Sequence, residues 1–203
     1  MSIPNQKEAV PFAFYAERFR DVSPAAVTAR LGSVRWDGSE FYVNLLGRTY
    51  AISHPDYAIR AVDGNSIPSL TVQTFLLRCL LECRDVDGTG TWKTFRELPW
   101  GETYAAAFAG RALARAAFSF GNRLDAFRAA CENMGAQPIP HSDAGYQFAL
   151  LGSYQMRLLV WEGDEEFPPN AQILFSDNFA AGFTAEDRAV AGDILISVIK
   201  NRM

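Results

Sequence analysis

The sequence predicts an α+β protein in which antiparallel β-hairpins and sheets pack against a buried central helix and several further helices. Apolar residues make up 49% of the 203 residues and charged residues 21%, which is typical of globular proteins. Helix-like and strand-like patterns follow one another in blocks, without the sustained βαβ alternation of a parallel sheet. No Pro/Gly/Ser-rich linker interrupts these blocks. We therefore expect a single domain over residues 1–203.

The first block combines helices with a β-meander. Residues 6–20 have the pattern of an amphipathic helix that is disturbed near Pro11. Ser23 and Pro24 are suited to cap and start a short helix that ends at Gly32. Strand-forming residues then predict short strands, with turns at Asp37-Gly38 and Leu46-Gly47, over residues 33–37, 40–45, 48–52 and 57–62.

The second block begins with residues 66–84, the most apolar helical stretch, which we expect to be the central buried helix. Residues 91–101 form an aromatic loop or short strand. An alanine-rich helix, which Gly110 divides in two, and a further helix with an apolar stripe are predicted over residues 102–120 and 123–134. Strands follow over residues 145–150, 154–161 and 171–176, and Thr184 with Asp187 forms the capping box of a final helix.

Charge and cysteine content exclude several classes of protein. The chain has 19 Lys and Arg residues against 23 Asp and Glu residues, and no helix carries a basic stripe, so nucleic-acid binding is not expected. No apolar segment approaches the roughly 20 residues that span a bilayer, and the N-terminus lacks a signal-peptide pattern. The 3 cysteines are interpreted as free thiols in a reducing, cytoplasmic location.

An acidic turn is the best-defined local motif. Four carboxylates, at Glu162 and at residues 164–166, lie between Trp161 and the Pro168-Pro169 bend. Such a cluster can bind a hard cation or can simply keep a hairpin end solvated. Asp177 would join the cluster if strand 171–176 pairs antiparallel with strand 154–161. The metal-ligand candidates are therefore Asp164, Glu166 and Asp177.

An aromatic segment is the second candidate for a ligand-binding site. Trp92, Phe95, Trp100 and Tyr104 alternate with charged residues that include Arg96. Aromatic rings beside cations can line a pocket for a planar ligand, but the same rings can fill the core. The ligand-binding candidates from both motifs are Trp92, Arg96, Trp100, Trp161, Asp164, Glu165, Glu166 and Asp177.

The remaining chemistry-bearing residues have ordinary structural interpretations. His54 and His141 lie in turn sequences, and we interpret both as surface-loop histidines. Cys79 and Cys83 lie among leucines and are interpreted as buried thiols rather than metal ligands. No phosphate loop, dinucleotide fingerprint or zinc motif is present, and no catalytic residue is assigned.

Two runs, Gly90–Gly101 (GTWKTFRELPWG) and Trp161–Pro168 (WEGDEEFP) with Ile173–Asp177 (ILFSD), carry a family resemblance. The sequence resembles the prokaryotic domain of unknown function 3786 family from about residue 25 to the end. The resemblance implies a setting in anaerobic corrinoid or one-carbon metabolism, because some relatives are fused to iron–sulfur modules or described as corrinoid-associated. The chain has no four-cysteine motif, so we expect no iron–sulfur cluster of its own.

Three functional hypotheses follow. The first is a non-catalytic accessory domain that binds a corrinoid, or a corrinoid or iron–sulfur partner protein. The second is an enzyme that uses a divalent metal at the acidic turn 162–166. The third is a homo-oligomeric structural protein. The sequence leaves open whether the protein is an enzyme, what its oligomeric state is, and whether the acidic turn and segment 92–104 share a cleft.

Overall fold

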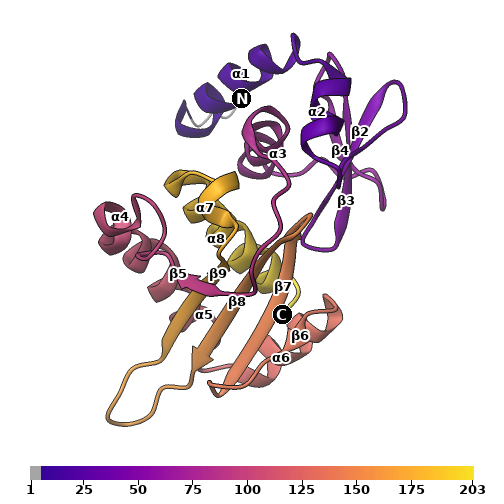
Figure 1. The fold of residues 1–203 in the computed structure, drawn as a ribbon. Helices are drawn as coiled ribbons and strands as arrows, with labels where there is room; N and C mark the ends of the chain where they lie inside the picture. Colours follow the sequence, from indigo (N-terminus) through magenta and orange to yellow (C-terminus); the bar gives the residue numbers. More distant parts are fainter. Residues whose placement is uncertain (1–5) are drawn as a thin grey trace. The chain divides into compact units, whose positions relative to one another are not determined.

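The computed structural model describes residues 6–203 and confirms the α+β class. All strand pairings within these residues are antiparallel, and they form a four-stranded and a five-stranded sheet (Figure 1). The chain separates into two compact units, of which the first ends at Asp85 and the second spans Val86–Met203. Each unit is described by itself. No helix in the described residues is long and apolar enough to cross a membrane.

The first unit contains the predicted helices and β-meander. Helix α1 packs against α3, and the four strands pair in chain order. The elements are α1 (Gln6–Phe19), α2 (Pro24–Arg30), β1 (Arg35–Trp36), β2 (Glu40–Leu45), β3 (Arg48–Ser53), β4 (Ile59–Ala61) and α3 (Leu70–Glu82).

The predicted turns and caps of this unit are confirmed. The Ser23 side chain accepts a hydrogen bond from the Ala26 amide and caps α2. One carboxylate oxygen of Asp37 accepts from the Glu40 amide at 2.9 Å and closes the first hairpin turn. Leu46 and Gly47 have φ angles of 51° and 78°, the left-handed conformations that suit a two-residue hairpin turn.

Helix α3 is the buried helix that the sequence predicts. Six consecutive residues, from Phe75 to Leu80, are buried. The helix begins at Leu70 rather than at residue 66, because Pro68 lacks an amide donor and the Ser69 side chain accepts the Val72 amide as an N-cap.

His54 differs from its interpretation as a surface-loop histidine. Its imidazole lies edge-on against the rings of Phe19, Trp36 and Phe41, with centroid distances of 5.2, 6.1 and 6.1 Å. Sequence periodicity does not reveal this contact because the aromatic residues come from a helix and two strands far from the turn.

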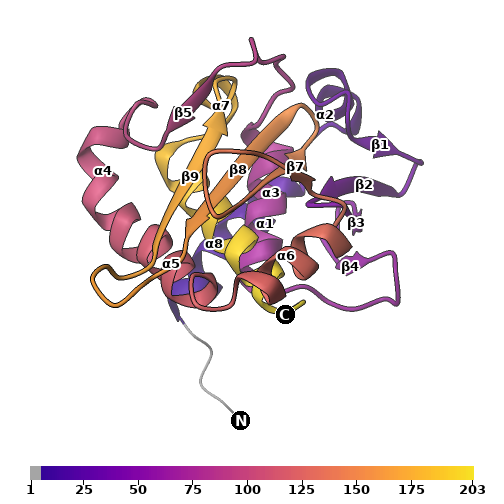
Figure 2. The same ribbon diagram turned by 90° about the horizontal axis from the view of Figure 1, so that it is seen from below.

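The second unit is built on the five-stranded sheet, whose strand order is β5-β9-β8-β7-β6. Figure 2 shows the long strands β9, β8 and β7 side by side. The strands at the two edges are short, and the three long strands form its centre. The elements are β5 (Trp92–Thr94), α4 (Gly101–Phe108), η1 (Ala109–Leu113), α5 (Ala114–Phe120), α6 (Leu124–Asn133), β6 (Gln137–Pro138), β7 (Ala144–Leu151), β8 (Tyr154–Trp161), β9 (Asn170–Ser176), α7 (Phe179–Gly182) and α8 (Ala185–Lys200).

Alternation along β8 assigns the two faces of this sheet. Met156, Leu158 and Val160 are fully buried on the face against which α5 packs, whereas Gln155 and Arg157 are half-buried on the other face. Side chains of paired residues on neighbouring strands share a face, so this division extends across β7 and β9.

The alanine-rich stretch is interrupted where the sequence indicates. A π-helical turn, η1, contains Gly110 and separates α4 from α5. Arg111 and Arg115, which lie on and just after this turn, both form ion pairs with Asp193 of α8. Helix α8 begins with the predicted capping box between Thr184 and Asp187.

Two glycines of this helical stretch allow a matched stability test. A Cβ at Gly101 would lie 1.8 Å from the Phe95 carbonyl oxygen, whereas a Cβ at Gly110 would meet nothing within 4 Å. We expect Gly101→Ala to destabilise the protein by about 1–3 kcal/mol or more through overpacking. Gly110→Ala should stabilise it by roughly 0.5–1 kcal/mol, because alanine restricts the unfolded chain. Denaturant unfolding measures both, and equal effects of the two substitutions would contradict the packing at Gly101.

Candidate functional site

The register of β9 places the acidic turn and strand β5 at opposite ends of the sheet. Asn170 pairs with Trp161 at the acidic turn, whereas Ser176 pairs with Trp92 of β5. These positions are six residues apart on β9, roughly 20 Å at the rise of a β-strand. Strands β8 and β9 are antiparallel, as the sequence hypothesis required, but Asp177 follows the end of β9 that is remote from the acidic turn.

Asp177 holds the loop that leads into β5. Its carboxylate accepts hydrogen bonds from the Thr89 amide at 3.0 Å and from the Thr89 hydroxyl at 2.6 Å. These hydrogen bonds hold the pKa of Asp177 below its ordinary value, and the bond from the Thr89 hydroxyl has the largest effect. The neighbouring Asn178 donates to the Val86 carbonyl at 2.8 Å. The two polar residues after β9 therefore anchor residues 86–89.

The acidic turn is organised by its own backbone. One carboxylate oxygen of Asp164 accepts from the amides of Glu166 and Phe167 at 2.8 and 2.7 Å. Glu165 and Glu166 are exposed. No group of three or more His, Cys, Asp or Glu side chains in residues 6–203 has an arrangement that could hold a metal ion. The proposed set of Asp164, Glu166 and Asp177 is accordingly not brought together.

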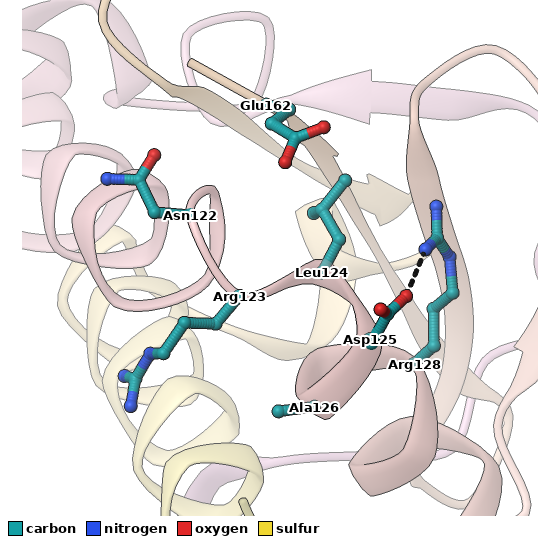
Figure 3. Close-up of a pocket in the computed structure, with 7 residues that line it drawn as sticks. All are labelled: Asn122, Arg123, Leu124, Asp125, Ala126, Arg128 and Glu162. Carbon is teal, nitrogen blue, oxygen red and sulfur yellow. Dashed lines mark hydrogen bonds and ion pairs between the residues drawn. The ribbon is translucent and has the colours of Figure 1, made fainter. Parts of the chain in front are cut away.

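A pocket of about 300 Å³ lies beside the acidic turn, where Glu162 faces the start of α6 (Figure 3). Arg128 lines it and donates to the Asp125 carboxylate at 2.9 Å and to the Asp143 carbonyl at 2.8 Å. Arg123 donates to the Ser119 carbonyl at 2.8 Å. Both arginines thus have acceptors within the protein. The full lining is Asn122, Arg123, Leu124, Asp125, Ala126, Arg128 and Glu162.

The aromatic segment does not form one pocket. Phe95 is buried and stacks on Phe108 with a centroid distance of 4.1 Å, so it belongs to the core. Trp100 is 76% exposed and has a left-handed φ of 62° immediately before α4. Arg96 forms an exposed, two-pronged ion pair with Glu102, which raises the pKa of Arg96 and lowers that of Glu102.

Trp92, the first aromatic residue of the segment, belongs to a polar cluster on the sheet face opposite the one that packs against α5. The Arg157 guanidinium lies over the Trp92 ring, 3.9 Å from its centroid. Arg157 Nε donates to the Gln147 side-chain oxygen at 3.0 Å, and the Gln147 amide donates to Gln155 at 2.6 Å. We call these four residues the Arg157 cluster. Burial lowers the pKa of Arg157, and no other cause contributes to the shift.

Motif-based reasoning identified Trp92 but missed the other members of the Arg157 cluster. Gln155 and Arg157 occupy alternate positions of a strand that was correctly predicted over residues 154–161. Marking polar residues at these positions would have placed both on the solvent-facing side of the sheet. The contact with Gln147 and Trp92 depends on strand order, which the sequence pattern leaves open.

The anchoring role of Asp177 can be tested by comparison with a nearby carboxylate. Asp177→Ala removes both acceptors of Thr89, so we expect faster hydrogen exchange of the Thr89 amide and loosening of residues 86–91. Asp87→Ala is the control, since Asp87 is exposed and makes no hydrogen bond within the described residues. Equal exchange rates in the wild type and Asp177→Ala would contradict this role.

The lowered pKa of Asp177 makes its contribution to stability depend on pH. Because the pKa of Asp177 is lowered in the folded state, its stabilising contribution is present above its unfolded-state pKa and is lost as pH falls through the folded pKa. The Thr89 amide resonance should therefore titrate at a pH below the ordinary aspartate pKa, which NMR measures directly. Titration at the ordinary value would contradict the hydrogen bonding.

Comparisons with known proteins give the family of the chain. A family model described as "Domain of unknown function (DUF3786)" matches residues 23–198. No curated protein matches, and no solved structure matches. Parts of the two runs that carry the resemblance also meet in the fold, because Trp92–Thr94 pairs with Leu174–Ser176 and the Asp177 amide donates to the Thr91 carbonyl at 3.0 Å. The chain belongs to the DUF3786 family of domains of unknown function.

Proposed function

We propose that this chain is a non-catalytic accessory domain that binds a ligand or partner in anaerobic corrinoid or one-carbon metabolism. The observation that carries the binding role is the Arg157 cluster. It presents an indole, two side-chain amides and an unneutralised guanidinium on the sheet face opposite the helices. Few convergent polar groups on a rigid scaffold are typical of a binding site.

The chemistry of the cluster supports a corrinoid or corrinoid-carrying partner. Glutamine side chains both donate and accept hydrogen bonds, and amides like those on the rim of a corrin ring can use both functions. The link to corrinoid metabolism comes from the family resemblance, and we propose the Arg157 cluster as the site of contact. The partner in this proposal is a corrinoid or iron–sulfur protein.

The state of the thiols supports a binding role in a reducing, cytoplasmic location. Cys79, Cys83 and Cys131 are buried and form no disulfide in the described residues. Burial raises the pKa of Cys131, so its thiol stays protonated and unreactive. Free, buried thiols are typical of reducing compartments, and they are not placed to act as nucleophiles.

Titration with cyanocobalamin tests the ligand-binding role. We expect saturable chemical-shift changes at the Trp92 indole N–H and at the side-chain amides of Gln147 and Gln155 in ¹⁵N-labelled protein. Gln137→Ala, which changes an edge-strand glutamine paired with Gln147 outside the cluster, is the control and should bind normally.

A second measurement covers binding through a partner protein. Tagged protein is purified from its native host under anaerobic conditions and examined by absorbance and by cobalt and iron analysis. A bound corrinoid or a co-purifying corrinoid or iron–sulfur protein supports the proposal. The absence of cyanocobalamin shifts together with the absence of cobalt and iron would overturn it.

A further inference from the structure

Arg157 differs from four other arginines of its unit in how its charge is accommodated. Arg96, Arg111, Arg115 and Arg128 each form an ion pair with a carboxylate. Within the described residues Arg157 contacts only neutral partners, the Gln147 side chain and the Trp92 ring. Its positive charge is therefore partly removed from solvent, and no carboxylate of the described residues neutralises it.

The geometry leaves the binding edge of this guanidinium available. Gln147 occupies Nε, and Trp92 covers the guanidinium from one side. The two terminal nitrogens donate to no described residue. Gln155 in turn accepts from Gln147 and fixes the orientation of that amide. The guanidinium is thus held in one orientation before any ligand arrives, which reduces the entropy lost on binding.

The position on the sheet makes this arrangement rigid. Arg157 lies on β8, the central strand, and pairs with Leu174 of β9 and Gln147 of β7. The side chain reaches across β9 to Trp92, which pairs with Ser176. The cluster consequently links three strands, β7, β8 and β5, the last across β9, and none of its members lies in a loop.

We infer that Arg157 is an anion-binding residue that takes the carboxylate or phosphate group of a small-molecule ligand at its terminal nitrogens. Both groups present two oxygens that match the planar fork of a guanidinium. The charge that burial leaves uncompensated is neutralised when such a group binds. This inference rests on the proposed binding role of the same sheet face and names the charge that its ligand carries.

Inorganic phosphate and acetate are the probes, each titrated at constant ionic strength maintained with sodium chloride. We expect saturable shifts of the Arg157 Nε–H and Trp92 indole N–H resonances with at least one of them, the latter assigned with Trp92→Phe. A response to phosphate alone identifies a phosphate site, and a response to acetate alone identifies a carboxylate site.

Substitutions separate a specific site from a general charge effect. Arg157→Gln should weaken binding of the responding probe at least about tenfold, because it removes a charged hydrogen-bonding fork. Arg157→Lys, which keeps the charge but loses the fork, should bind between the two. Arg111→Gln is the matched control, since Arg111 is already paired with Asp193 on α8, and it should bind like the wild type. Thermal unfolding verifies that each variant is folded.

The outcomes distinguish this inference from the proposed function. Failure of both probes to shift the two resonances, or equal affinity of wild type and Arg157→Gln, overturns the anion site. A cyanocobalamin response without a phosphate or acetate response leaves the proposed function standing and overturns the inference. An Arg157-dependent anion response without a corrinoid or partner supports the inference and overturns the corrinoid link.

Discussion

The second unit depends on the antiparallel placement of β9 between β5 and β8. This pairing fixes the register in which Trp92 lies beside Ser176 and Trp161 lies beside Asn170. It brings the run Gly90–Gly101 beside the run Ile173–Asp177, although about 70 residues separate them in the sequence. The same register keeps the acidic turn away from β5 and brings Trp92 within reach of Arg157.

Arg188 and Arg157 both have lowered pKa values, but their guanidinium groups differ in burial and in hydrogen-bond acceptors. Arg188 is 1% exposed, and burial lowers its pKa to about 10. Its terminal nitrogens donate to the backbone carbonyls of Phe183 and Pro99, so α8 is tied to the loop before α4. Arg157 is only half-buried, and its terminal nitrogens have no acceptor in the described chain. Both terminal nitrogens of Arg188 are used in hydrogen bonds within the protein, whereas those of Arg157 are not.

Much of the fold was predictable because local rules determine it. The apolar face of α3, the Thr184 capping box and the Leu46-Gly47 turn each depend on residues close together in the sequence. Short elements such as β6 and α7 were missed, since two to four residues carry too little periodicity to identify.

The candidate site was less predictable because it depends on long-range pairing. Asp164 and Asp177 are prominent in the sequence, yet each accepts hydrogen bonds that organise a loop. A count of carboxylates cannot distinguish this use from a metal site. Trp92 was recognised as a candidate, but its partner Arg157 is 65 residues away. Their contact exists only once the strand order β5-β9-β8 is known.

The alternation of side chains along β8 has a consequence for how this family can vary in evolution. Met156 and Leu158 belong to the core, while Gln155 and Arg157 belong to the opposite face. A single-residue insertion or deletion within this strand would exchange the two sets and put a guanidinium into the core. Substitutions at position 157 leave the core face unchanged, whereas a change in the length of the strand does not. Sequence change in this segment should therefore proceed by replacement of side chains, with insertions confined to the hairpin connections at either end.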